Sequence, residues 1–380
     1  MISPNAPQRS SFLAVRPVLG LAAATLLILT AMAHWVRVPP CFADPSPIRF
    51  TDAAGQAVHL KSVPRRIVVV GQAPYVILHM LYMFPEAADR LVGYEQKVKS
   101  KELFLTLIDP HYEGKIALQT NPGPEHIAAC KPDVVLIKSS SAGPLEKVLN
   151  TIGIPVVHLY PENPRRFLEA VDQLGVILNN PARAGQIRKY YQSRLDRIAA
   201  PLTAVAPGSA PSILVMKYGD RTGAVAMQVP ASSWIQTLQV QITGGQPVWL
   251  ADFSAGDGWQ VVGFEQIAQW NPDKLFMVVW YRLDGCQVVR KLMADPKWRR
   301  LKAVADQQFF LFPEDIYGWD SPGPRWILGA LWMAAHTHPP LFPDLDMHKE
   351  VYEFFNHLYG LDRPAVDTHI LSRVRLHGCP

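Results

Sequence analysis

The sequence predicts an α/β protein of two Rossmann-like lobes with central, mostly parallel sheets, joined by a single long α-helix. Three observations predict this fold. Runs of β-branched residues alternate with helical patterns, which is typical of parallel sheets. One sequence pattern occurs in both halves of the chain. A Pro/Ala/Gly/Ser stretch at 201–211 separates these halves and directly follows a long polar helical segment.

Residues 1–43 have the pattern of an export signal. Arg9 and Arg16 precede an uncharged apolar run at 18–33, and the small-x-small site at 41–43 suits cleavage after Ala43. The apolar run is short for a membrane span, which favours a cleaved signal, and an uncleaved membrane anchor is the alternative. Both interpretations place the protein outside the cytoplasm, and we expect it in the periplasm.

Charge and cysteine content exclude several functions. The formal charge is +5, but the leader is basic and has no acidic residue before Asp44, so the remainder carries only about +2. This balance gives no reason to expect a nucleic-acid partner. The cysteines beyond the leader are too scattered for a disulfide framework or a metal site, and buried free thiols are expected unless one pair is bridged. They are Cys130, Cys286 and Cys379.

The N-terminal lobe is expected over 44–178. It opens with a β-hairpin whose strands, 48–52 and 57–60, flank a turn with a glycine. The apolar run at 65–71 suits a central strand buried on both faces, and a helical pattern at 76–84 follows it. The remaining elements are expected at 134–137 (strand), 144–151 (helix), 155–159 (strand) and 164–178 (helix).

A connecting helix is expected over 179–200, starting at Pro181, and the C-terminal lobe over 201–380. The helix is rich in charge, as suits a connector between lobes, although an ordinary surface helix has the same pattern. The second lobe begins with an apolar run at 212–216, after which we expect a loop and a helix, as in the first lobe.

Two internal matches predict that the lobes share one plan. The pattern E-x-I-A-x-x-x-P-D at 125–133 recurs at 265–273, each time before an apolar strand. A turn of similar sequence, 159–163, recurs in the same order at 311–315. Two-lobed α/β proteins hold ligands in the crevice where the carboxyl ends of their strands meet.

The candidate ligand contacts are mainly loop residues that follow the predicted strands. Nine of the ten tryptophans lie between Trp234 and Trp332, so the second lobe supplies most of the aromatic surface. Aromatic side chains suit a bulky, partly apolar ligand, while Lys and Arg suit a ferric chelate or a carboxylate-bearing cofactor. The candidates are Gln72, Tyr75, Ser139, Ser140 and Ser141 in the first lobe, and Lys217, Tyr218, Arg221, Trp249, Trp259, Tyr281, Arg282, Tyr317, Trp319 and Arg325 in the second. Core packing is the alternative for Trp249 and Trp259, and bracing of the 322–324 loop for Arg325.

The ordered set of features resembles the periplasmic binding proteins of the iron-siderophore and cobalamin ABC importers. It comprises the opening hairpin with Pro64–Val68, the two E-x-I segments, the Pro181 helix, and W-D-S-P-G-P-R at 319–325. The resemblance implies a receptor without catalytic activity or cofactor, which captures a ferric siderophore, haem or corrinoid between its lobes. It also implies delivery to a permease dimer in the inner membrane, and we expect the receptor itself to be a monomer.

The same resemblance implies that Glu125 and Glu265 dock to the permease. Two carboxylates on equivalent lobe surfaces can meet a symmetric pair of subunits. Alternatively, each only complements the dipole of its helix.

The sequence favours three other functions less than a receptor for a metal complex. A receptor of the same family for molybdate or tungstate would use hydroxyl and backbone N–H groups, for which the serines at 139–141 are candidates. An exported α/β enzyme is less favoured, because the chain has no G-x-S-x-G, G-x-x-x-x-G-K-[ST] or H-E-x-x-H motif. We expect no site for a naked metal ion, because most histidines do not follow predicted strands.

Overall fold

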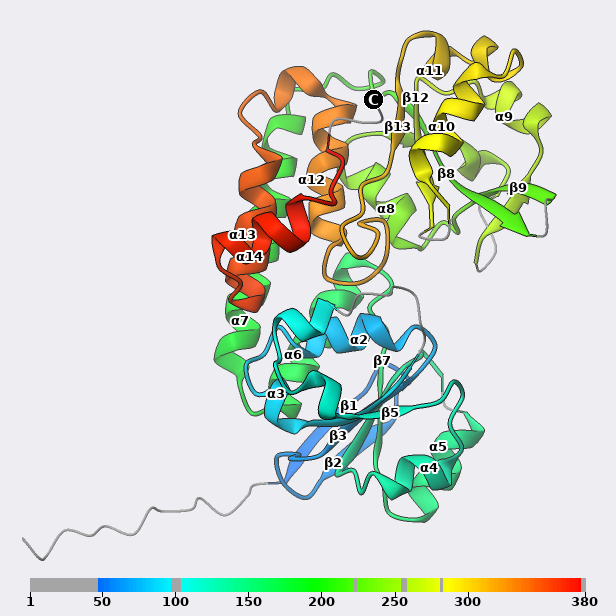
Figure 1. The fold of residues 1–380 in the computed structure, drawn as a ribbon. Coiled ribbons are helices and arrows are strands. Elements are labelled where there is room, and N and C mark those ends of the chain that lie inside the picture. The colour runs from blue at the N-terminus through cyan, green and yellow to red at the C-terminus, as the bar shows by residue number, and fades with distance from the viewer. Residues whose placement is uncertain are drawn as a thin grey trace, which may run out of the picture. The chain divides into compact units, whose positions relative to one another are not determined.

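A hairpin and a five-stranded parallel sheet form the first lobe of the computed structural model (Figure 1). The predicted hairpin is confirmed, with β1 (Ile48–Thr51) and β2 (Ala57–Leu60) paired antiparallel. The sheet order is β5-β4-β3-β6-β7. Its strands are β3 (Ile67–Gly71), β4 (Leu91–Glu95), β5 (Ile116–Leu118), β6 (Val134–Lys138) and β7 (Val156–Leu159). The helices are α2 (Pro74–Leu81), α3 (Ala87–Arg90), α4 (Pro124–Ala129), α5 (Pro144–Thr151) and α6 (Pro164–Ile177), with 3-10 turns η1 (Phe104–Leu107) and η2 (Tyr112–Gly114).

The structure describes residues 47–96, 104–141, 143–221, 224–253, 258–280 and 283–376. The proposed export signal lies outside the described residues, as do the candidates Tyr281 and Arg282. In these ranges no helix combines the length and the apolar character needed to cross a membrane.

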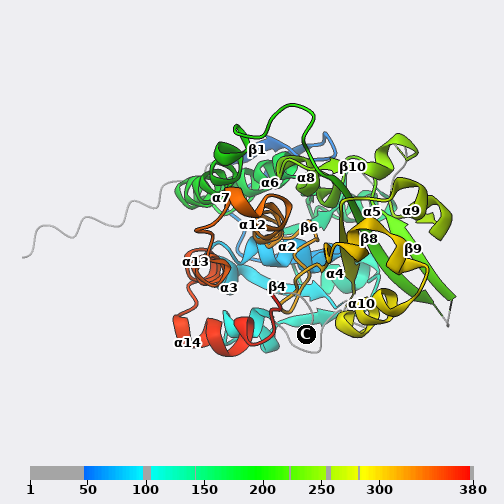
Figure 2. The ribbon, with the colours of Figure 1, turned by 90° about the horizontal axis from the view of Figure 1, so that it is seen from above.

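The long helix α7 (Pro181–Leu202) joins the two lobes, as predicted (Figure 1). Asn180 caps it by accepting the N–H of Arg183 at 3.0 Å, and Pro181 occupies the first turn, where its missing N–H costs no hydrogen bond. The charged face of α7 is only partly solvated, because Arg194 and Arg197 form ion pairs with Glu350 of α13. Figure 2 shows α7 beside α12 and α13.

The second lobe has a mixed sheet of order β11-β9-β8-β12-β13, with β10 also paired to β8. Its strands are β8 (Ser212–Arg221), β9 (Ala224–Val229), β10 (Gln246–Pro247), β11 (Gln260–Val262), β12 (Lys274–Val279) and β13 (Phe309–Leu311). The helices are α8 (Ile235–Ile242), α9 (Phe264–Trp270), α10 (Gly285–Ala294), α11 (Lys302–Ala305), α12 (Trp326–Thr337), α13 (Met347–Tyr359) and α14 (Arg363–Val366). Short helical turns are η3 (Val248–Ala251), η4 (Trp298–Arg300), η5 (Pro339–Leu341) and η6 (Asp367–Leu371).

The start of the second lobe differs from the prediction. Instead of a strand, a loop and a helix, β8 continues to Arg221 and pairs antiparallel with β9. Lys217, Tyr218 and Arg221 are therefore strand residues and not loop residues. The apolar run alone marked only the buried start of β8, because the pairing with β9 that extends the strand comes from the tertiary fold.

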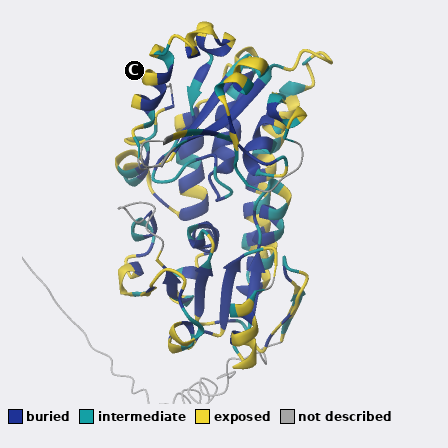
Figure 3. Cartoon of the chain, turned by 90° about the vertical axis from the view of Figure 1, so that its right-hand side faces the viewer, coloured by how far each residue is buried: buried dark blue, intermediate teal, exposed yellow. Residues whose placement is uncertain are grey.

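The inner strands of both sheets, among them β3, β6 and β12, are mostly buried (Figure 3). β3 and β6 lie at the centre of the first sheet, and the β-branched composition of β3 suits its burial on both faces. β4 and β5 were not predicted. β5 has only three residues, and β4 contains a glycine and a glutamate, which weaken the apolar pattern of a strand.

The aspartate that ends each E-x-I-A-x-x-x-P-D segment fixes a neighbouring strand. Asp133 Oδ2 accepts the N–H groups of Arg65 and Arg66, just before β3, at 2.8 and 2.9 Å. Asp273 Oδ2 accepts the N–H and the hydroxyl of Ser212, at the start of β8, both at 2.8 Å. Burial raises the pKa of Asp273, but hydrogen bonds from Lys302 and Ser212 outweigh it and lower the pKa to about 2.

Arg325 lies buried in a core that is continuous between the lobes. Its Nε donates to both carboxylate oxygens of Asp315 at 2.8 Å, and its Nη1 lies 3.3 Å from Nδ1 of His79 on α2. The guanidinium also packs 4.4 Å from the ring centroid of Phe104 and 5.1 Å from that of Phe355. Burial, and next the charge of Arg325, hold the pKa of His79 well below its usual value. The neutral ring can therefore accept a hydrogen bond from Arg325.

The cysteines agree with the expectation only in part. Cys130 is a buried free thiol, as expected, whereas Cys286 is disulfide-bonded. Cys41 and Cys379 lie outside the described residues.

Replacing Asp273 by alanine should lower the free energy of unfolding by about 1–3 kcal/mol, because it leaves the Ser212 N–H without its acceptor. The pKa of this carboxyl is lower in the folded state, so its contribution is complete above pH 3.8 and is lost as the pH falls toward about 2. Urea unfolding of Asp273→Ala beside Asp306→Ala, at an exposed acid of the same lobe, measures this. Equal stability of the two variants would contradict the assignment.

Replacing Arg325 by methionine should cost about 3–5 kcal/mol, because Asp315 is then buried without its counter-charge. The double variant Arg325→Met/Asp315→Asn should lose less, since it leaves no unpaired charge in the core. Urea unfolding of Arg325→Met, Asp315→Asn and the double variant, with Arg165→Met on the exposed surface of α6 as control, tests this coupling. A double variant that loses the sum of the two single losses would show that the pair does not interact.

Candidate ligand-binding site

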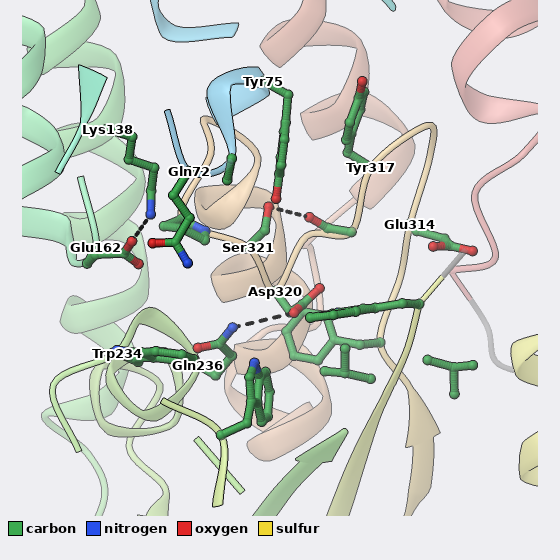
Figure 4. Close-up of a pocket in the computed structure, with 18 of the residues that line it drawn as sticks. Gln72, Tyr75, Lys138, Glu162, Trp234, Gln236, Glu314, Tyr317, Asp320 and Ser321 are labelled. Carbon is green, nitrogen blue, oxygen red and sulfur yellow. Dashed lines mark hydrogen bonds and ion pairs between the residues drawn. The ribbon is translucent and has the colours of Figure 1, made fainter. Parts of the chain in front are cut away.

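A cavity of about 410 Å³ lies where the carboxyl ends of strands from both lobes meet (Figure 4). Gly71, at the end of β3, permits the tight turn into the cavity. Its φ is +101°, and a Cβ there would lie 2.8 Å from Cγ2 of Ile137. The cavity is lined by Gln72, Ala73, Tyr75, Lys138, Tyr160 and Glu162 from the first lobe, and by Trp234, Gln236, Gly258, Trp259, Val278, Val279, Trp280, Phe312, Pro313, Glu314, Ile316, Tyr317, Gly318, Asp320, Ser321 and Pro322 from the second.

Two tyrosines meet across the lobes at one side of the cavity. Tyr75, in the first turn of α2, stacks on Tyr317 with ring centroids 5.2 Å apart and planes at 14°. Burial, and next the charge of Asp320, raise the pKa of the Tyr75 phenol far above its ordinary value, although a hydrogen bond with Ser321 opposes this. Tyr75 is therefore neutral and offers the cavity an aromatic surface.

The only lysine that lines the described part of the cavity is already paired. Lys138 ends β6, and its Nζ forms an ion pair with Glu162, which follows β7 (Figure 4). Both side chains are largely buried, so each charge is balanced mainly by the other.

Three tryptophans, Trp234, Trp259 and Trp280, form an aromatic wall on the second lobe. Trp259 packs edge-on against Trp234 and Trp280, with centroid distances of 5.9 and 6.5 Å. Lys217 Nζ lies 4.4 Å from the Trp259 centroid and 4.1 Å from the Trp280 centroid. Lys217 supports this wall by cation–π contacts and is not a lining residue.

The loop after β13 brings two carboxylates to the cavity, Glu314 and Asp320. Asp320 is 5% exposed and accepts a long hydrogen bond, 3.5 Å, from Nε2 of Gln236 (Figure 4). Burial, and then the charges of Asp320 and Asp315, raise the pKa of Glu314 from 4.5 to about 7, and Arg375 opposes this shift. Both the protonated and the ionised form of Glu314 are therefore populated near neutral pH.

The structure brings four of the predicted contacts to the cavity, namely Gln72, Tyr75, Trp259 and Tyr317. It places others in the core. The indole N–H groups of Trp249 and Trp319, both fully buried, donate to the carbonyl of Pro230 and to the Asp315 carboxylate. Each buried indole packs against apolar side chains and has its N–H satisfied, so neither faces the cavity.

The remaining candidates also do not line the cavity. Arg325 pairs with Asp315, and Tyr218 is buried in β8. Ser139 and Ser141 bond to one another within their own turn, and Ser140 is exposed at its surface. Tyr281 and Arg282 lie outside the described residues, and of Arg221 only the backbone is described.

The sequence-based prediction did not include several residues that line the cavity, although one signal for them was present in the sequence. These residues include Lys138, Trp234, Trp280, Glu162, Glu314 and Asp320. The repeated turn places Glu162 and Glu314 at matching positions, and Tyr160 matches Phe312. All four line the cavity. Across the described ranges no cluster of three or more His, Cys, Asp or Glu side chains is arranged to hold a metal ion.

The raised pKa of Glu314 predicts a pH-dependent stability. The folded state binds a proton at Glu314 more tightly than the unfolded chain does, so the contribution of Glu314 to stability should be complete below pH 4.5 and be lost as the pH rises through about 7. Replacing Glu314 by glutamine should remove this part of the decrease. Urea unfolding at about pH 5 and about pH 8 measures it, with Glu113→Gln as the exposed control. An unchanged pH dependence in Glu314→Gln would contradict the assignment.

Comparisons with known proteins agree with the two-lobed fold. The molybdate-binding protein MolA of Haemophilus influenzae is 24% identical over 265 residues, 62% of this chain and 69% of MolA. Its molybdate-bound structure superposes with a TM-score of 0.64 and 19% identity, covering 83% of this chain and 98% of that one. A periplasmic solute-binding protein of Veillonella parvula gives a TM-score of 0.67 at 22% identity, with 86% and 98% covered.

A third structure, CeuE of Helicobacter pylori in a nickel–histidine complex, gives a TM-score of 0.65 at 18% identity, with 85% and 99% covered. These likenesses concern the fold. A family model described as "Periplasmic binding protein" matches residues 67–316, well over half of the sequence. The chain therefore belongs to the periplasmic binding protein family.

Proposed function

We propose that this protein is the receptor of an ABC importer, that it captures a metal complex in the cavity between its lobes, and that it hands the complex to a membrane permease. The family consists of binding proteins and not of enzymes. One observation carries the proposal: side chains at the carboxyl ends of strands in both lobes line a single aromatic cavity. Such a cavity can enclose a ligand and present it to a partner that touches both lobes.

The size of the cavity favours a chelate over a small oxyanion. A volume of about 410 Å³ lies in the range of small-molecule sites. Four oxygens of an oxyanion occupy roughly the space of four waters, about 120 Å³. The tyrosine pair and the tryptophan wall would leave such an ion without polar partners over most of its surface, whereas they can pack against the apolar parts of a siderophore or tetrapyrrole.

Molybdate or tungstate is the second candidate, because MolA is a molybdate-binding protein. Against it, the serines at 139–141 do not line the cavity and carboxylates do. An oxyanion needs converging N–H and O–H donors, and it is repelled by carboxylates.

The packing between the lobes supports capture with only a small closing motion. The core continues from one lobe into the other, and Arg183 of α7 donates to the carbonyls of Met83, His357 and Leu358. Large rotation of the lobes would break these hydrogen bonds and expose apolar surface.

The docking role of Glu125 and Glu265 fits their matched placement. Each is the second residue of a short helix, α4 or α9, that follows a glycine, and each is exposed. A Cβ on Gly123 would lie 2.3 Å from Oε1 of Glu125, so this glycine leaves room for the carboxylate at the helix start. The same position could serve only the helix dipole, and a transport assay separates the two roles.

The ligand can be identified by purifying the receptor from its native host. Mass spectrometry and metal analysis of the bound material should find one organic chelate and one metal ion per chain. Molybdenum or tungsten without an organic ligand would replace this proposal by the oxyanion alternative. Conversion of the bound compound into a product would refute the receptor function.

Replacing Glu125 and Glu265 together by alanine should abolish transport and leave ligand affinity unchanged, because neither side chain lines the cavity. Uptake by cells and ligand titration of the purified receptor measure the two quantities. The matched control is Glu113→Ala/Asp306→Ala, which removes one exposed acid from each lobe. Unimpaired uptake by the Glu125→Ala/Glu265→Ala receptor would show that these residues do not dock to the permease.

A further inference from the structure

The cavity has more negative than positive charge among its described lining residues. One lysine faces three carboxylates, Glu162, Glu314 and Asp320. Resting on the proposed function, we propose that the receptor selects cationic or donor-rich metal chelates and rejects polyanionic ones, with Asp320, Glu314 and Gln236 as the residues that set this preference. This differs from the expectation that Lys and Arg side chains would receive a negatively charged ligand.

Three of the described cations near the cavity are already engaged. Lys138 is paired with Glu162, and Arg325 is paired with Asp315, neither of which lines the cavity. Lys217 packs on the ring faces of Trp259 and Trp280. An anionic ligand would have to compete for these groups, and each displaced carboxylate would then be left buried without its partner.

Gln236 supplies a polar atom that has no hydrogen-bond partner among the described residues. The residue is 4% exposed and lines the cavity, and its Oε1 is buried without a hydrogen bond. Its Nε2 faces the Asp320 carboxylate, and a flipped amide would place two acceptors against each other, so the orientation is fixed. A buried carbonyl oxygen without a donor is costly, and a ligand N–H or O–H group would satisfy it.

Glu314 extends the same acceptor group. It matches Glu162 in the repeated turn, but no ion pair joins it to any described residue within 4.0 Å, whereas Glu162 has Lys138. The charges that act on the Glu314 carboxyl are those of Asp320 and Asp315, which raise its pKa, and that of Arg375, which lowers it. The lining residues that end β12 are apolar or aromatic, Val278, Val279 and Trp280, so this strand offers no counter-charge.

A binding series with chelates of similar size and opposite charge tests the proposal. The probes are a cationic ferric trihydroxamate, a neutral ferric trihydroxamate, an anionic ferric tricatecholate and sodium molybdate, titrated by quenching of the cavity tryptophans. The cationic or the neutral chelate should bind most tightly. Asp320→Asn and Glu314→Gln should each weaken binding of the cationic chelate about ten-fold or more, and should not weaken that of the anionic one.

Three controls keep the outcomes distinct. Glu113→Gln removes an exposed acid and should change no affinity, and thermal melting shows whether each variant is folded. Gln236→Leu should weaken the binding of chelates that carry N–H or O–H groups, although it does not change the charge of the cavity. Preferred binding of the tricatecholate or molybdate would overturn the charge preference and leave the receptor function standing. If the folded wild-type protein binds none of the four probes, the charge preference fails, whereas the metal-complex function is decided separately by the material bound in the native host.

Discussion

The ion pair between Asp315 and Arg325 is the interaction on which the cavity depends. Asp315 accepts the backbone N–H groups of Ile316 and Tyr317, the indole N–H of Trp319, and the Arg325 guanidinium. One buried carboxylate thus fixes the loop that carries Glu314, Tyr317 and Asp320 into the cavity. The arginine in turn packs on aromatic rings of both lobes, so the loop is positioned against the first lobe as well. A buried pair of this kind stabilises only when its remaining hydrogen bonds are made, and here most of them are.

The repeated segments keep the same structure in both lobes, except at the turn after the last parallel strand. In each repeat the closing aspartate fixes the start of a neighbouring strand, which is a structural role that both lobes need equally. The opening glutamate stays exposed on both lobes and is available to a partner that touches both. The turn after the last parallel strand has diverged: Asn163 caps a helix, whereas Asp315 at the matching position organises the cavity loop.

Rigidity and ligand capture are compatible in this arrangement. The apolar core runs through both lobes behind the cavity, and α7 is tied to both by hydrogen bonds from Arg183 and from the Tyr191 hydroxyl to Pro324. The cavity itself is lined largely by loops, and among the described residues Oε1 of Gln236 is buried there without a hydrogen bond. Binding can therefore improve local hydrogen bonding without large rearrangement of the core.

The sequence by itself determined the α/β class, the two-lobed plan, the connecting helix and the aromatic character of the second lobe. These depend on local patterns: buried strands have β-branched runs, helices start at Asn-Pro, and a repeated segment keeps its spacing. Tertiary structure alone decided which loop residues face the cavity. Trp249 and Trp259 flank the same glycine-containing segment of the sequence, yet Trp259 lines the cavity and Trp249 lies in the core. Likewise, the ion pairs Lys138–Glu162 and Arg325–Asp315 form only after the fold brings separate segments together. The partner of a buried side chain is set by packing between these segments and not by its neighbours in the chain.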